Sequence, residues 1–163
     1  MDPARSGGCL TDLHVHDLDI VRYLLGEPEA VSCRATTSVS VHDTVHTSLF
    51  YGDVPVTVIG DWSLAGMKFR DDSRFDFERA TVEYASDVLT VYPKDGSASY
   101  TVPLEEGSAY CREISYFCDV IAGGKENVKN PAESAARTIA LVERLRESIA
   151  GKGEILSFDP TVI

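Results

Sequence analysis

The spacing of hydrophobic positions changes twice along the chain. It begins with a helical repeat, which places Leu13, Ile20 and Leu24 on one apolar stripe. Thr11 precedes this stripe and is of the type that caps helices, and Gly26 follows it as a left-handed stop. The pattern therefore predicts an amphipathic helix that begins at Thr11 and ends at Gly26.

Over residues 30–102 the repeat shortens to two, which is typical of half-buried strands. Gly52-Asp53 lies between two of these stretches and indicates a hairpin. Pro55 has no N–H group for a ladder hydrogen bond, so we expect it at a strand start or on an edge strand. The predicted strands are residues 31–36, 46–51, 54–59, 75–84, 88–92 and 99–102. Because no helix interrupts them, they indicate a largely antiparallel sheet.

The helical repeat then returns in two segments. The first, residues 110–122, places Ile114, Phe117 and Ile121 on one face, and the second runs from Asn130 to Gly151. Residues 155–158 can form a last strand. The order of helix, strands, two helices and strand predicts one α+β domain over residues 1–163.

Charge and hydropathy exclude two classes of partner. The 163 residues include 15 Lys+Arg and 26 Asp+Glu, a net charge of −11, and no basic cluster that would attract a phosphate backbone. No apolar run approaches the roughly 18 residues of a membrane-spanning helix, and no signal-peptide core is present. We therefore expect neither nucleic acid nor membrane as a partner, and a cytoplasmic location.

The four cysteines form no pair with metal-ligand spacing. Free thiols in a reducing compartment are the simplest interpretation. Cys111 and Cys118 are two helical turns apart, on what the pattern predicts to be a core face. We expect both to pack in the core.

Chemistry is concentrated in the first predicted helix. Asp12, His16 and Asp19 stand at i, i+4 and i+7 and would share one stripe of a helix. Histidine titrates near neutrality and suits proton transfer, and a carboxylate one turn away can orient it. The spacing alone also fits solvated acids beside a surface or core histidine. Gly7 and Gly8 would let the backbone approach a ligand closely.

A metal site is disfavoured. His14 and His16 diverge by about 200° around a helix, so they cannot both face one ion. His42 and His46 would share a strand face only if the strand began before His42. Neither pair has the further ligands that zinc requires, so we expect no metal.

Three segments resemble the Gfo/Idh/MocA oxidoreductases, the family of glucose–fructose oxidoreductase and inositol dehydrogenase. Residues 6–19 read SGGCLTDLHVHDLD and are similar to the family's hallmark, a Gly-Gly pair followed by D-x-G-x-H-x-x-D at the start of a helix. Residues 23–28, YLLGEP, continue the match. The other two segments are residues 109–117, AYCREISYF, and residues 130–153. The resemblance extends over nearly the whole chain.

The resemblance implies the family's C-terminal domain: an open, mostly antiparallel sheet with helices on one face. In the family the other face commonly forms dimers or tetramers. Carried over, His16 is the acid/base for the hydroxyl proton of a sugar or polyol substrate, and Asp12 positions substrate and histidine. Asp19 would support them, and the backbone of Gly7 and Gly8 would lie near cofactor or substrate.

Two departures qualify these expectations. His14 stands where the family usually has glycine or another uncharged residue, which would alter the substrate fit. No G-x-G-x-x-G follows a strand, and the family's Glu-Lys-Pro lysine has no counterpart. We therefore expect the dinucleotide-binding domain to be absent from this chain. NAD or NADP would belong to the complete enzyme, and the chain alone would be inactive. The alternative is a standalone, non-catalytic oligomeric binding or scaffold domain derived from the family.

Overall fold

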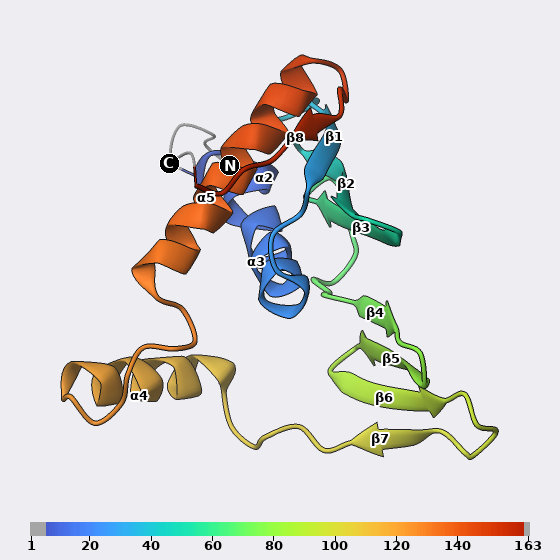
Figure 1. Ribbon diagram of the computed structural model, residues 1–163, viewed down its shortest axis with the longest axis vertical. Helices are drawn as coiled ribbons and strands as arrows, with labels where there is room; N and C mark the ends of the chain where they lie inside the picture. Colours follow the sequence, from blue (N-terminus) through green and yellow to red (C-terminus); the bar gives the residue numbers. More distant parts are fainter. Residues whose placement is uncertain (1–5, 162–163) are drawn as a thin grey trace. The chain divides into compact units, whose positions relative to one another are not determined.

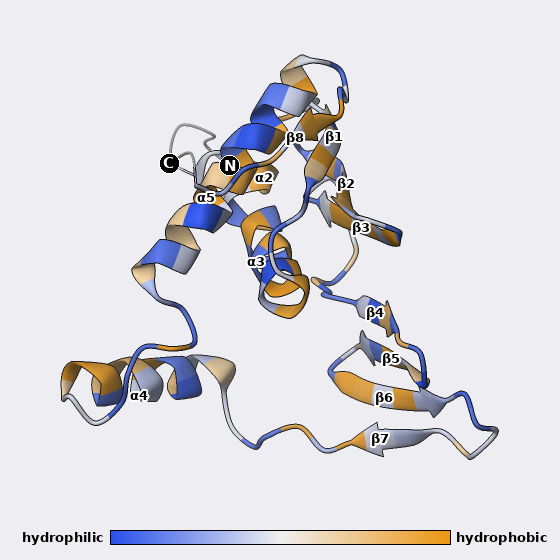
Figure 2. Cartoon of the chain, in the orientation of Figure 1, coloured by the Kyte–Doolittle hydropathy of each residue, from blue (hydrophilic) through white to orange (hydrophobic). Residues whose placement is uncertain are grey.

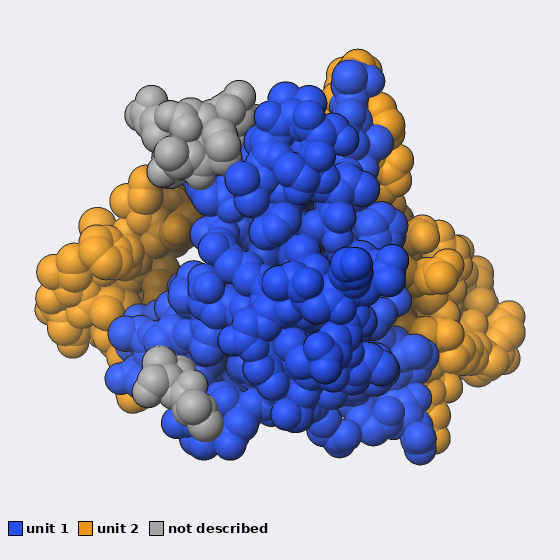
Figure 3. All heavy atoms as spheres, turned by 90° about the horizontal axis from the view of Figure 1, so that it is seen from above, with its two compact units in different colours: residues 1–65, 127–163 blue, residues 66–126 orange. Residues whose placement is uncertain are grey.

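The computed structural model describes residues 6–161, which form helices and two open antiparallel sheets (Figure 1). They divide into two compact units, coloured separately in Figure 3. Unit 1 contains the described residues up to Ala65 and from Asn127 onward, and unit 2 is Gly66–Glu126. The α+β class is confirmed, with two four-stranded sheets where the strand pattern predicted one. No helix of the described part is both long and apolar enough to cross a bilayer.

Unit 1 combines helices with a sheet in the order β3-β2-β1-β8. Its helices are α2 (Cys9–Asp12), α3 (His14–Leu25) and α5 (Ala132–Ala150), and its strands are β1 (Ala30–Thr36), β2 (Thr44–Tyr51), β3 (Val54–Asp61) and β8 (Leu156–Ser157). Each neighbouring pair is antiparallel. Tyr51 pairs with Val54, so the hairpin turn predicted at Gly52-Asp53 is confirmed. Pro55 lies on β3, an edge strand, where a missing N–H group costs nothing.

The core of unit 1 lies between one face of this sheet and the helices. Alternate residues of the strands point to the core, so that Val45, Thr47 and Leu49 of β2 are buried, whereas His46 and Ser48 between them are exposed. Leu18 of α3 and Leu141 of α5 are fully buried against them. Figure 2 shows α3 and α5 each with hydrophobic and hydrophilic sides. The helices thus cover one sheet face, as expected.

Unit 2 contains the sheet β4-β5-β6-β7, again antiparallel throughout, and one helix. These elements are β4 (Ser73–Asp76), β5 (Ala80–Ala85), β6 (Val88–Pro93), β7 (Tyr100–Val102) and α4 (Ala109–Ile121). The prediction of one strand over residues 75–84 is wrong. The N–H of Phe77 donates to the carbonyl of Ala80 at 2.9 Å and reverses the chain there. Apolar residues stand at odd positions before the turn (Phe75 and Phe77) and at even positions after it (Val82 and Tyr84), and the prediction missed this shift of phase.

The apolar face of α4 is not covered. None of its residues is buried, and Ile114 and Phe117 are each 62% exposed. Cys111 and Cys118 are exposed as well, so the prediction that they pack in the core is wrong. The sequence pattern defines which side of a helix is apolar, whereas burial requires a second element to pack against that side.

Candidate functional site

The segment that carries the hallmark forms two helices instead of one. α2 begins after Gly8, whose carbonyl accepts hydrogen bonds from the N–H groups of Thr11 and Asp12 at 3.2 and 3.1 Å. The chain then bends at Leu13, with φ −109° and ψ −60°, before α3 starts. The expected cap at Thr11 is therefore wrong, and its hydroxyl instead accepts a hydrogen bond from Arg146 of α5.

Gly7 and Gly8 have positive φ angles of 76° and 81°, which favour glycine. A Cβ atom on Gly8 would lie 2.0 Å from the carbonyl oxygen of Val41, and one on Gly7 would lie 3.0 Å from the Cβ of Thr11. The chain's own atoms thus explain why both positions need glycine. Their proximity to a ligand stays a prediction.

Asp12 and His16 both reach solvent from the two sides of the bend at Leu13. Within residues 6–161 no hydrogen bond or ion pair joins them, since the bend interrupts the i, i+4 geometry of a single helix. An exposed imidazole can exchange a proton with a substrate hydroxyl, and an exposed carboxylate can accept its hydrogen bond. The pair can therefore act on a ligand without first breaking a contact with each other.

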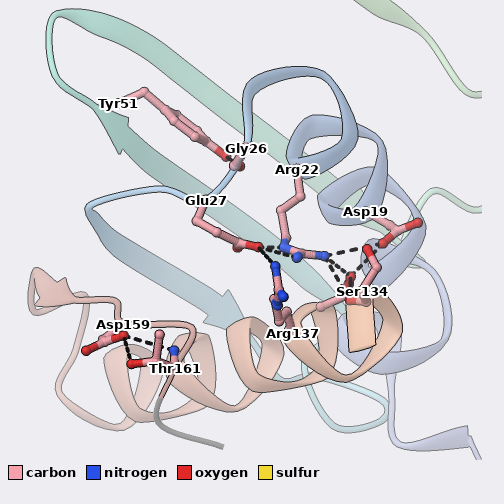
Figure 4. A network of polar contacts seen from close by, with 10 residues as sticks. Asp19, Arg22, Gly26, Glu27, Tyr51, Ser134, Arg137, Asp159 and Thr161 are labelled. Atoms are coloured by element: carbon pink, nitrogen blue, oxygen red, sulfur yellow. Dashed lines mark hydrogen bonds and ion pairs between the residues drawn. The ribbon is translucent and has the colours of Figure 1, made fainter. Parts of the chain in front are cut away.

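Asp19 faces α5. The hydroxyl of Thr138 donates to its Oδ1 at 2.5 Å, and Arg22 Nη1 lies 3.6 Å from the same oxygen. Figure 4 shows the Asp19 side chain within this group of contacts. The structure therefore gives Asp19 a part in attaching α3 to α5.

Arg22 is the centre of this group and was not singled out by the sequence. Only 7% of the residue is exposed, yet its Nε donates to Glu27 Oε2 at 2.8 Å and its Nη1 to the carbonyl of Ser134 at 3.1 Å (Figure 4). A second contact joins Nη2 to Glu27 Oε1. The hydrogen bond to Glu27 raises the pKa of Arg22 above its usual value. The i, i+3 spacing of Asp19 and Arg22 was the only available sequence signal.

His14, the departure from the family pattern, is fully buried. Its Nε2 lies 2.9 Å from Thr47 Oγ1 on β2, and the Thr47 hydroxyl donates to Cys33 Sγ at 3.2 Å. Burial raises the pKa of the nearby Cys9 thiol to about 12. His14 therefore lies in the core, and His16 is the histidine of this segment that a substrate can reach.

The loop between β1 and β2 lies against Gly8 and is organised by Asp43. The backbone N–H groups of Val39 and Ser38 donate to its carboxylate, at 2.7 and 2.5 Å, and hold the pKa of Asp43 well below its usual range. His42, which precedes it, has a positive φ of 56°, and burial together with the charge of Arg146 lowers the pKa of His42. β2 begins at Thr44, so His42 and His46 do not share a strand face. In the part of the chain that the structure describes, no three His, Cys, Asp or Glu side chains are placed to hold a metal.

Solved structures share this fold. A levoglucosan dehydrogenase in complex with NADH and levoglucosan superimposes with a TM-score of 0.78 at 19% identity, over 96% of this chain and 52% of that chain. UDP-N-acetylglucosamine 3-dehydrogenase from Acidithiobacillus ferrooxidans superimposes with a TM-score of 0.80 at 18% identity, over 93% of this chain and 50% of that chain. The fold is therefore that of a domain found in dehydrogenases.

Sequence comparison defines the family. The profile of the GFO/IDH/MocA C-terminal domain matches residues 1–99. The chain belongs to the Gfo/Idh/MocA family of oxidoreductases.

Two curated relatives are inositol dehydrogenases. The chain is 29% identical to scyllo-inositol 2-dehydrogenase (NAD(+)) of Bacillus subtilis (strain 168), over 74% of this chain and 39% of the relative. It is 28% identical to inositol 2-dehydrogenase of Rhizobium meliloti (strain 1021), over 93% of this chain and 50% of the relative. The chain thus spans half the length of these relatives or less.

Proposed function

We propose that this chain is the substrate-binding part of an NAD- or NADP-dependent dehydrogenase that oxidises a CH–OH group of a sugar or polyol of the inositol type. His16 is the acid/base and Asp12 its orienting partner. The observation that carries the proposal is the exposure of these two side chains at the hallmark positions, while the neighbouring His14 is enclosed. The inositol dehydrogenases among the relatives support the substrate class.

The proposed role of His16 follows from the balance of the reaction. Conversion of CH–OH to a carbonyl removes a hydride from carbon and a proton from oxygen. A neutral imidazole within hydrogen-bond reach of the hydroxyl accepts that proton. The Asp12 carboxylate accepts a hydrogen bond from the substrate and stabilises the imidazolium once it forms.

The nicotinamide cofactor, which supplies the hydride acceptor when bound, does not fit this chain alone. Dinucleotide sites form at the carboxyl ends of parallel strands that lead into helices, and every strand pair of the described residues is antiparallel. We therefore assign cofactor binding to another part of the enzyme, and the 163-residue chain by itself would be inactive.

We further propose that the open face of the unit 1 sheet joins copies of the chain into dimers or tetramers. This face presents a row in which Arg34, His46 and Ile59 stand side by side on three strands. Ile59 is 55% exposed there, an apolar residue that a partner would cover.

Replacement of His16, with a second exposed side chain as control, tests the proposed catalytic role. In the enzyme purified from its native host, His16→Asn should lower kcat for NAD(P)-dependent inositol oxidation by about 10²- to 10⁴-fold, the usual contribution of an acid/base. Asp53→Asn is the control, because Asp53 is also exposed but lies in the turn between β2 and β3, and it should keep wild-type kcat. Wild-type turnover in His16→Asn would refute the assignment.

A further inference from the structure

His14 is held by two strands of the sheet. It is the first residue of α3, and none of its surface is exposed. A Cβ atom on Gly60 of β3 would lie 3.0 Å from His14 Nδ1 and 3.2 Å from His14 Cβ. The imidazole therefore lies directly on the β3 backbone, in space that only glycine leaves open, while its Nε2 reaches Thr47 on β2.

The contact with Thr47 is directional. The single proton of the Thr47 hydroxyl is donated to Cys33 Sγ, so its oxygen remains as the acceptor for an N–H on His14 Nε2. Among the residues that the structure describes, His14 Nδ1 has no hydrogen-bond partner, and the carboxylate oxygen Asp17 Oδ2 lies 3.6 Å away. One hydrogen bond and the Gly60 surface thus define the orientation of the imidazole.

The contact of His14 with the sheet determines where His16 points. Residues two apart on a helix diverge by about 200°, so a side chain at position 14 that faces the sheet requires His16 to face away from it. The bend at Leu13 lies immediately before His14. Asp12 is therefore the last residue of the short helix α2, and the contact of His14 with the sheet holds the junction between α2 and α3. Both exposed groups therefore depend on one buried contact.

We propose that His14 is a positioning residue, which sets the placement of Asp12 and His16 through its hydrogen bond to Thr47. The inference rests on the proposed function, because it assigns to His14 the alignment of the groups that would transfer the proton. It also gives a reason for histidine at a position where the family usually has a smaller or uncharged residue. His14 would act from the core, without touching the substrate.

Three variants separate positioning from mere stability. Thr47→Val removes the acceptor and keeps the side-chain shape, so it tests the bond even if a change at His14 prevents folding. His14→Leu removes the donor, and His14→Gln restores an N–H group where Nε2 stood. Ser148→Ala is the control, since Ser148 is also fully buried and makes two hydrogen bonds, with Cys33 N and the Glu154 carbonyl, but it belongs to α5.

In the active enzyme, Thr47→Val and His14→Leu should lower kcat by about 10- to 100-fold with little change in KM, as expected for a small misplacement of reacting groups. His14→Gln should recover most of the loss, and Ser148→Ala should keep wild-type kcat. In NMR spectra recorded at one fixed pH, the chemical shifts of the His16 imidazole should change in the first two variants only.

The proposal is overturned if Thr47→Val and His14→Leu change thermal stability alone and match Ser148→Ala in kcat and in the chemical shifts of His16. His16→Asn, measured in parallel, keeps the two ideas apart. If that variant retains full activity, the proposed function fails, and the chemical shifts of His16 in the other variants still decide whether His14 controls its surroundings.

Discussion

The contact network around Arg22 leads to a quantitative prediction about the stability of unit 1. The guanidinium joins the last turns of α3 to Glu27 beyond the helix and to Ser134 and Thr138 of α5 (Figure 4). Arg22→Met keeps most of the aliphatic stem and removes every one of these hydrogen bonds. The Glu27 carboxylate, whose side chain is only 23% exposed, then loses its main partner.

The size of the loss follows from that burial. Removal of one partner from a buried ion pair costs about 3–5 kcal/mol, mostly because the remaining charge is left uncompensated. Glu27 retains partial access to solvent and has Arg137 at 3.9 Å, so the lower end applies and we expect about 3 kcal/mol for Arg22→Met. Arg137→Met is the matched control, since this exposed pair should contribute about 0–1 kcal/mol.

Urea denaturation followed by circular dichroism measures both changes as shifts of the midpoint at constant slope. The double variant Arg22→Met/Glu27→Met should lose less than the sum of the single variants, because neither partner is then left as a lone buried charge. If Arg22→Met costs no more than Arg137→Met, the network does not stabilise the junction of α3 and α5 and the reasoning is refuted.

Three further predictions follow from other parts of the chain. With Ellman's reagent, the thiols of Cys111 and Cys118 should react in the native protein, and the two buried thiols should react only after unfolding. Two equivalents are therefore expected before unfolding. Four equivalents in the native protein would contradict the burial of Cys9 and Cys33. Backbone N–H groups hold the pKa of Asp43 below its usual value, so its carboxylate stabilises the fold above about pH 4, and this contribution is lost as the pH falls further. Asp43→Asn should therefore flatten the acid limb of a curve of stability against pH. An unchanged limb would disprove this. Gly8→Ala should lower the melting temperature far more than Gly26→Ala. Both glycines have positive φ, but a Cβ on Gly8 would meet a backbone oxygen at 2.0 Å, whereas one on Gly26 would meet no described atom within 4 Å. Equal losses would exclude the close contact.

Local geometry was predictable where the pattern repeats within one element. The period-two pattern correctly indicated strands over residues 46–51 and 54–59, and Gly52-Asp53 correctly placed the hairpin between them. The turn after Phe77 was not recognised, because it contains no Gly, Pro, Asn or Asp and is marked only by the polar pair Glu78-Arg79, where the phase of the alternation shifts.

The candidate site was only partly visible in the sequence. The hallmark spacing pointed to Asp12 and His16, and the structure exposes both. It did not show that the helix bends between them at Leu13, because the spacing of polar residues carries no signal for such a bend. Nor did it show that Asp19 faces α5, because its partner Thr138 is 119 residues away.

By itself, the sequence determined the periodicity of the elements, the chemical types at the hallmark positions and the family resemblance, because all of these are recorded in the order of neighbouring residues. Only the tertiary structure decided which histidine is enclosed and which is accessible. His14 and His16 are both polar and two residues apart, and their fates differ because Thr47, 33 positions from His14, and Gly60 provide a fitted place for one imidazole beneath α3. Such a place exists only once the strands have paired and the helix has packed on them, so no local pattern can reveal it.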